Sequence, residues 1–219
     1  MRRALAIASV FVALALAACS TPPTFLSDLS HHSNATLDPR PIAFVDHASR
    51  RARKLASAAQ GQVGKTVHYD AAYVTLAYPG GDVPIDRGVC SDVVVRAFRS
   101  LGVDLQVEVH KDMSAHFSAY PHLWGLTRPD ASIDHRRVPN LQAYFRRRGK
   151  ALAVTHVGSD YWPGDIVTWS LGGPVHIGIV STIPAPDGTR YCMVHNIGAG
   201  TQVEDVLFTY RITGHYRPL

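Results

Sequence analysis

Three residues far apart in the chain have the types needed for covalent acyl transfer: Cys90, His176 and His195. A cysteine attacks a carbonyl as its thiolate, and a nearby histidine takes the thiol proton and later protonates the leaving amine. A third polar group on the other imidazole nitrogen fixes the tautomer and the orientation of that ring. We therefore expect Cys90 as nucleophile, His176 as general base and His195 as the orienting residue. Each alone is also compatible with a structural role, since free cysteines are often core residues.

The segment around Cys90 predicts a helix that begins close to the cysteine and stops near Gly102. Its apolar residues recur at helical spacing: Val93, Val94, Ala97, Phe98 and Leu101. Gly88 favours a tight turn directly before the helix. Unpaired backbone N–H groups and the helix dipole at an N-terminus favour a thiolate, so we expect the pKa of Cys90 to be lowered.

A β segment near the C-terminus carries His176. Alternation along a strand places His176 and Gly178 on one face and Ile177 and Ile179 on the other. A glycine leaves room for another element to approach closely, so we expect the Cys90 helix to pack on the face with His176.

The following β segment carries His195. Here alternation places His195 on one face with Tyr191 and Met193, so neighbouring strands would present His176 and His195 side by side. A register shifted by one residue would instead bring Asn196 to the site as the third member of the triad.

The order of the predicted elements indicates the α+β fold class. Helical patterns come first, over residues 42–61, 91–102, 111–120 and 140–149. Short β segments with Gly-, Pro- and Asp-bearing turns follow from residue 166 onward, which is typical of an antiparallel meander. About 200 mature residues are enough for one core, so we expect a single domain over 42–219.

The N-terminus resembles a bacterial lipoprotein signal peptide over residues 1–18. Two arginines precede an apolar run that is too short to span a membrane. The sequence Leu16-Ala17-Ala18-Cys19 resembles a lipobox, which implies lipidation of Cys19. Ser20 after the cysteine resembles lipoproteins of the outer membrane, and residues 19–41 read as a flexible tether. We therefore expect a periplasm-facing lipoprotein of the outer membrane.

Composition narrows the choice of partners. Removal of residues 1–18 lowers the formal net charge from +5 to +3, because two arginines are lost. This mild charge and the short basic runs argue against nucleic-acid binding and favour a weak attraction to anionic cell-wall polymers. No cofactor motif is present, and we expect a monomer. Cys90 and Cys192 would lie in an oxidising compartment, and the sequence leaves open whether they form a disulfide.

Several motifs look like those of the NlpC-type papain-like cysteine peptidases, which act on cell walls. They are Val89-Cys90-Ser91, Pro163-Gly164-Asp165, the run 176–180 and Met193-Val194-His195. Four further motifs are similar to a YijF-like branch of unknown function, over about residues 45–219: 78–84, 86–92, 134–140 and 214–217. The resemblance implies a papain-like fold in which the nucleophile helix packs on a C-terminal antiparallel sheet. It also implies a triad on Cys90, His176 and His195.

One departure affects substrate specificity. The peptidases usually carry Asp-Cys-Ser-Gly, whereas Val89 precedes the cysteine here and Asp92 replaces the glycine. Their preference for γ-D-glutamyl–diamino acid bonds therefore does not follow. Asp86, Asp92 and Tyr78 are candidates for binding substrate, and the two aspartates would hold a cationic group of it. The alternative for Asp86 and Asp92 is capping of the helix N-terminus.

The leading hypothesis is an exported lipoprotein cysteine hydrolase that cleaves an amide bond in peptidoglycan stem peptides or a similar cell-wall substrate. One alternative is a cysteine amidase or acyltransferase on another envelope substrate. Another is a non-catalytic lipoprotein of the same fold that binds the cell wall. A zinc site on Cys90, His176 and His195 is a further alternative, which the scattered spacing disfavours, so we expect no metal.

Overall fold

The computed structural model describes residues 42–219, so the predicted signal peptide (1–18), Cys19 and the tether (19–41) lie outside the described residues. Within 42–219 the protein has an α+β fold, as the order of the sequence patterns predicts. The helices are α1 (Arg50–Gln60), α2 (Cys90–Arg99), α3 (Leu105–Ala115) and α4 (Val138–Arg147). The strands are β1 (His68–Tyr69), β2 (Arg87–Gly88), β3 (Ala151–Leu152), β4 (Ile166–Ser170), β5 (Val175–Pro184), β6 (Tyr191–Asn196), β7 (Thr201–Glu204) and β8 (Arg211–Tyr216). None of the helices in this range is long and apolar enough to cross a membrane.

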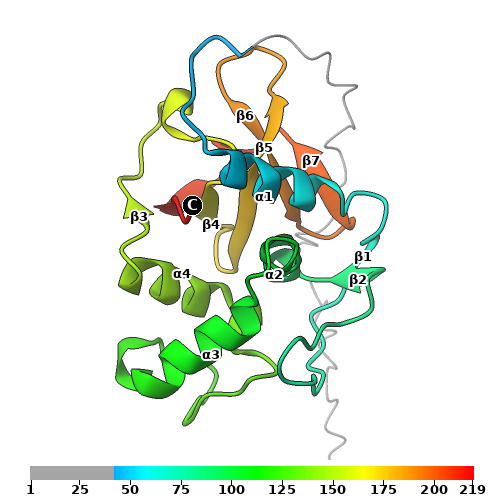
Figure 1. Cartoon of the computed structure of the whole chain (residues 1–219), viewed down its shortest axis with the longest axis vertical. Coiled ribbons are helices and arrows are strands. Elements are labelled where there is room, and N and C mark those ends of the chain that lie inside the picture. Colours follow the sequence, from blue (N-terminus) through cyan, green and yellow to red (C-terminus); the bar gives the residue numbers. More distant parts are fainter. Residues whose placement is uncertain (1–41) are drawn as a thin grey trace, which may run out of the picture. The chain divides into compact units, whose positions relative to one another are not determined.

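The main sheet has the strand order β3-β8-β4-β5-β6-β7, and every neighbouring pair is antiparallel (Figure 1). Strands β4 to β7 follow one another as the predicted meander. The last strand, β8, returns across the sheet and pairs with β4, a long-range pairing that the local pattern does not specify. A separate short parallel pair joins β1 to β2, and it brings residues 68–69 beside the turn that precedes Cys90.

Helices α1 and α2 pack against β5 and against each other (Figure 1). Their core includes the β5 residues Ile177 and Ile179, which confirms the predicted alternation of faces. The prediction that α2 would pack on the face with His176 and Gly178 is wrong. The space over Gly178 is already filled, since a Cβ there would lie 3.2 Å from the His195 Cβ and 3.3 Å from the Trp169 ring. Ile177 and Ile179 bury their side chains in one core with α1 and α2, and this burial favours packing of the helix on the isoleucine face.

One predicted helix begins later than the apolar pattern indicates, and another begins earlier. The helix predicted from residue 42 begins only at Arg50, where the Ser49 hydroxyl accepts a hydrogen bond from the Ala52 N–H at 3.0 Å. The helix predicted over 111–120 is α3, which begins at Leu105 because Asp104 caps it. A capping side chain supplies an acceptor for a free N–H, and this outweighs the apolar repeat in setting a helix start.

The start of α4 also differs from the prediction. The helix begins at Val138 with Pro139 in its first turn, where the missing N–H costs nothing. Asn140, predicted as the cap, is instead buried in the helix, and its side chain donates to the Asp134 carbonyl at 3.1 Å.

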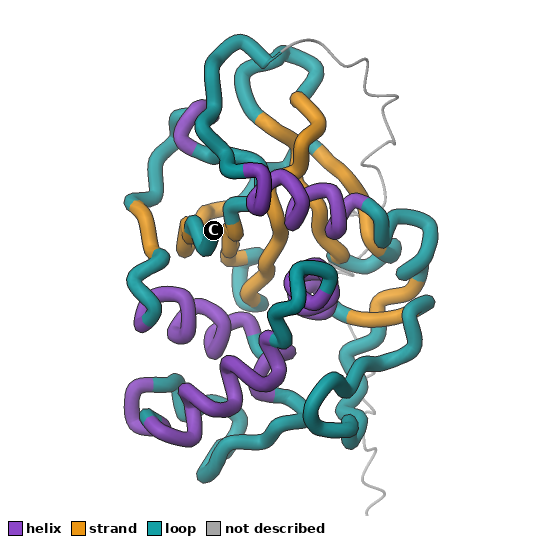
Figure 2. Tube along the Cα trace, viewed as in Figure 1, coloured by secondary structure: helices purple, strands orange, loops and turns teal. Residues whose placement is uncertain are grey.

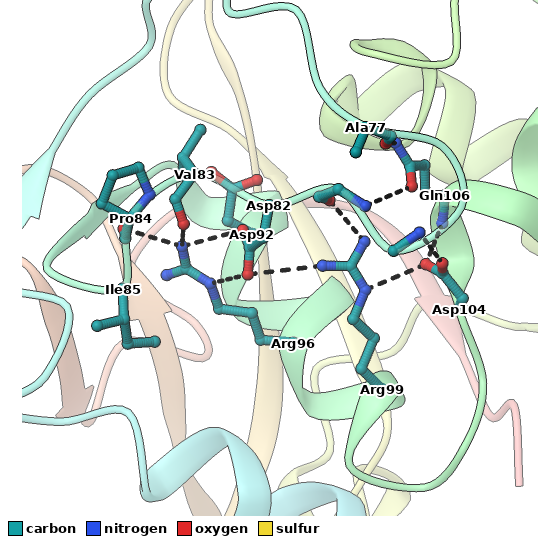
Figure 3. A network of polar contacts seen from close by, with 12 residues as sticks. Ala77, Asp82, Val83, Pro84, Ile85, Asp92, Arg96, Arg99, Asp104 and Gln106 are labelled. Atoms are coloured by element: carbon teal, nitrogen blue, oxygen red, sulfur yellow. Dashed lines mark hydrogen bonds and ion pairs between the residues drawn. The ribbon is translucent and has the colours of Figure 1, made fainter.

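Long connections over residues 70–86 and 116–137 have little regular structure (Figure 2). Two arginines of α2 hold the first of them in place (Figure 3). The Arg96 guanidinium binds the Asp82 carboxylate at 2.9 Å and donates to the carbonyls of Val83, Pro84 and Arg87. Arg99 binds the Asp104 carboxylate at 3.1 Å and donates to the Gly81 carbonyl. The chain that leads into Cys90 is therefore fixed to the helix that follows it.

Replacement of Arg96 by methionine should lower the free energy of unfolding by about 3 kcal/mol, because a buried guanidinium and several carbonyl partners lose their contacts. The Arg96 side chain is only 7 % exposed. Arg87, whose side chain is 46 % exposed and pairs with Asp86, provides the control. Arg87→Met should change the stability by less than about 0.5 kcal/mol. Urea denaturation of the two variants measures the difference, and equal losses would contradict the role given to Arg96.

Candidate active site

Cys90 is the first residue of α2 and lies at a turn that side chains hold firmly. The Asp92 carboxylate accepts a hydrogen bond from the Val89 N–H at 2.7 Å and so caps the helix. A Cβ on Gly88 would lie 2.9 Å from the same carboxylate, which explains the glycine before the cysteine. The thiol lies in the core beside Ile177 of β5, whose backbone N–H acts to lower the pKa of Cys90.

Asp92 also forms a buried ion pair with Arg136. The guanidinium donates to both carboxylate oxygens, at 2.9 and 3.0 Å, and the two side chains are at most 4 % exposed. Arg136 further donates to the carbonyls of Asp70 and Ala72. Both oxygens of Asp92 are occupied, so the structure assigns it the capping role rather than substrate binding.

The two predicted histidines lie side by side. Nε2 of His176 is 2.9 Å from Nδ1 of His195, and both residues are at most 3 % exposed. The Trp169 ring stacks on His176 with centroids 5.7 Å apart. Because His195 occupies Nε2, the nitrogen of His176 that is left for a thiol or a substrate is Nδ1.

Glu204 extends this pair into a series of three residues, which the sequence analysis missed. Its Oε2 lies 2.9 Å from Nε2 of His195. The same Nε2 makes no hydrogen bond within residues 42–219. Its contact with the Glu204 carboxylate is therefore close but lacks the alignment of a hydrogen bond. Glu204 is the residue opposite Met193 in the β6–β7 hairpin, on the face of His195. Alternation applied to the hairpin would have found it.

Cys90 and the side chain of His176 lie on different sides of β5, the strand that contains His176. Cys90 belongs to the core with Ile177 and Ile179, whereas His176 stacks on Trp169 on the other face. The two sites are linked by consecutive residues of the strand, because Cys90 packs in the core with Ile177 and His176 directly precedes Ile177. No hydrogen bond joins the thiol to either imidazole among the described residues. The structure thus brings His176 and His195 together and places Cys90 beside the residue that follows His176.

Burial keeps both the thiol and the imidazole neutral. It raises the pKa of Cys90 to about 12, although the Ile177 N–H acts in the opposite direction. The expectation of a lowered pKa at the helix N-terminus is therefore wrong, because desolvation outweighs the helix dipole here. Burial, the larger cause, and the neighbouring His195 lower the pKa of His176 well below its usual value.

The second buried cysteine takes no part in the site. Cys192 and Cys90 are both free thiols, so the disulfide left open by the sequence does not form. Burial raises the pKa of Cys192 to about 12, and its Sγ lies 3.6 Å from the Pro184 carbonyl oxygen. Asn196, the alternative third residue, donates to the Gly88 carbonyl at 3.0 Å and supports the turn before Cys90.

A cleft of about 500 Å³ opens beside Cys90. Aromatic and arginine side chains form much of its wall: Tyr69, Tyr73, Trp124, Arg136 and Arg137. Burial, with Cys90 and the Asp92 carboxylate nearby, raises the pKa of Tyr69 to about 12, so its hydroxyl remains a hydrogen-bond donor. These residues lie in the long connections and at their ends, where the sequence carries no periodic signal.

The other two substrate-binding candidates lie elsewhere. Tyr78 packs edge-on against the His110 ring with centroids 5.3 Å apart, and Asp86 pairs with Arg87 at 3.4 Å. Neither lines the cleft beside Cys90. Within the described part of the chain, no group of three His, Cys, Asp or Glu residues is arranged to hold a metal ion.

Comparison with known proteins finds two matches. Residues 56–218 match the family described as "Domain of unknown function (DUF1287)". The chain is also similar to "Uncharacterized protein YijF" of Escherichia coli strain K12, with 57 % identity over 164 residues. That alignment covers 74 % of this chain and 80 % of the relative.

Iodoacetamide should modify Cys90 before Cys192, because Cys90 lines the cleft and Cys192 is fully buried. The reason is access, since burial raises both pKa values. The rate at Cys90 should rise about tenfold for each pH unit between 7 and 10, because the thiolate fraction grows in that proportion below the pKa. Peptide mass spectrometry on time points measures both sites. A rate that is already constant at pH 7, or faster modification of Cys192, would contradict this prediction.

Proposed function

From the premise that this chain belongs to the DUF1287 family, we propose that it is a cysteine hydrolase of the bacterial envelope with a papain-like arrangement of catalytic residues. It cleaves an amide bond in peptidoglycan stem peptides or a similar cell-wall substrate. The proposal includes an N-terminal lipid on Cys19 that holds the domain at the outer membrane, facing the periplasm.

The observation that carries the proposal is the series His176–His195–Glu204, whose first member directly precedes Ile177, a residue that packs in the same core as Cys90. Such a series does what an acyl-transfer enzyme requires, because each member orients and polarises the next. His195 fixes the His176 ring through a 2.9 Å contact, and Glu204 lies 2.9 Å from the other nitrogen of His195. The likeness of the surrounding motifs to NlpC-type peptidases supports the same roles.

The reaction begins from the neutral forms of both groups. As the Cys90 sulfur attacks the amide carbonyl, its proton passes to Nδ1 of His176. The carboxylate of Glu204, acting through His195, stabilises the imidazolium that forms. The negative oxygen of the tetrahedral intermediate is stabilised by the Cys90 N–H, which has no intrahelical partner, and by the Tyr69 hydroxyl.

Collapse of the intermediate breaks the C–N bond and leaves a thioester on Cys90. The imidazolium of His176 gives its proton to the departing amine, so that a neutral amine leaves. Water then attacks the thioester, His176 takes its proton, and the carboxylic acid and the free thiol are released. The cleft of about 500 Å³ that Cys90 lines is the place for the substrate peptide.

Digestion of whole peptidoglycan tests the proposal. The mature wild-type protein should release fragments whose masses show one new amine and one new carboxylate at a stem-peptide amide. Cys90→Ala and His176→Ala should each reduce the rate by a factor of about 10³ or more, because both groups take part in proton transfer. His195→Gln keeps a hydrogen-bonding group and should retain at least about tenfold more activity than His195→Ala.

His156→Ala is the matched control for these variants, since His156 is an exposed histidine that packs against Phe208 away from the cleft. It should leave the rate unchanged. Circular dichroism checks that each variant folds. Peptidoglycan that stays intact with the wild-type protein, or a fully active Cys90→Ala variant, would refute the proposed activity.

The pH profile should report the depressed pKa of His176. A general base acts only when neutral, and burial and the neighbouring His195 lower the pKa of His176 well below 6.5. Activity should therefore persist as the pH falls from 7 to about 5.5, and the acid limb of kcat/KM should lie below 6.5. On the alkaline side no decline should begin near pH 8.5, because burial raises the pKa of Cys90. An acid limb at or above 6.5 would exclude a neutral thiol–imidazole pair.

A further inference from the structure

Arg137 carries a charge that no partner within residues 42–219 neutralises. Its guanidinium lies over the Trp124 ring, 4.6 Å from the centroid, and both residues line the cleft beside Cys90. Its Nη1 is buried and has no hydrogen-bond partner in the described part of the chain. A buried donor without a partner costs about 1–3 kcal/mol, so such a group indicates a partner that arrives with a ligand.

The charged side chains near Arg137 already have other hydrogen-bond partners. Arg136 next to it binds both oxygens of Asp92. Asp130 accepts hydrogen bonds from the hydroxyl of the cleft residue Tyr73 and from the Ser132 N–H. The cleft therefore presents one free guanidinium and no free carboxylate among these residues.

The start of α4 adds to the positive character of this wall. Arg137 is the N-cap residue of α4, and no side chain caps this helix. Val138 and Pro139 of its first turn also line the cleft. The positive end of the helix dipole thus lies on the same wall as the guanidinium, and both favour an anion.

We propose that Arg137, supported by Trp124, binds a carboxylate of the substrate in the cleft next to Cys90. The proposal rests on the proposed function and narrows its substrate class to peptides that bear a free carboxylate near the scissile amide. The planar guanidinium suits this role, because it forms two parallel hydrogen bonds to a carboxylate. Asp86 and Asp92 had instead suggested a cationic substrate group, and neither is free in the cleft.

A pair of alkylating reagents tests the subsite without any hydrolytic substrate. Iodoacetate and iodoacetamide are similar in size, and only iodoacetate carries a carboxylate. With either reagent the Cys90 thiolate displaces iodide from the CH₂ group, and the thiol proton passes to solvent. The measured quantity is the ratio of the iodoacetate rate to the iodoacetamide rate at Cys90, taken at pH 9 by peptide mass spectrometry.

The variant Arg137→Gln should lower this ratio by roughly five- to tenfold, the size expected for one close charge pair. Arg137→Lys keeps the charge and should retain part of the preference. Arg148→Gln is the matched control, since Arg148 also lies over an aromatic ring, that of Tyr144 at 5.8 Å, but outside this cleft. It should leave the ratio unchanged.

Each other outcome overturns a stated part of the account. An unchanged ratio in Arg137→Gln, or an equal fall in Arg148→Gln, would overturn the subsite and leave the proposed hydrolase standing. Failure of both reagents to reach Cys90 would overturn the subsite and the proposed function together. A lowered ratio in a protein that leaves peptidoglycan intact would support the subsite and refute the proposed activity.

Discussion

The buried ion pair between Asp92 and Arg136 is the contact on which the rest of the site depends. Asp92 caps α2 and thereby fixes the turn that carries Cys90. Arg136 holds the carbonyls of Asp70 and Ala72, so the wall with Tyr69 and Tyr73 is tied to the same pair. Arg136 also directly precedes Arg137 at the start of α4. A buried pair stabilises only when its remaining hydrogen-bonding groups are satisfied, and here backbone groups of Val89, Asp70 and Ala72 bond to the pair.

Desolvation sets the chemical state of the site. The same burial that orders Cys90 and His176 raises the pKa of the thiol and lowers the pKa of the imidazole. The two groups are therefore neutral together, and in the proposed reaction charge appears only when a substrate accepts the sulfur. The groups positioned to stabilise that charge are already in place: Glu204 behind His195, and the helix N-terminus at Cys90.

The predictions that succeeded depend on local geometry. Alternation along a strand is a property of the backbone, so the faces of His176 and His195 followed directly from the sequence. The start of α2 at Cys90 followed from a glycine turn and an apolar repeat. The predictions that failed depend on competition between distant groups. The face covered by α2, the pKa of Cys90 and the partner of Asp92 each required the position of a residue from another element.

The sequence by itself therefore determined the α+β class, the meander and the pairing of the two histidines, because hydrophobic periodicity and turn residues act within a few residues of one another. Tertiary structure alone decided the rest of the site. Trp169 fills the space over Gly178, Arg136 reaches Asp92 across 44 positions of the chain, and Arg137 remains unpaired in the cleft. These outcomes depend on which groups compete for the same buried space and the same charge, and that competition exists only once the chain is folded.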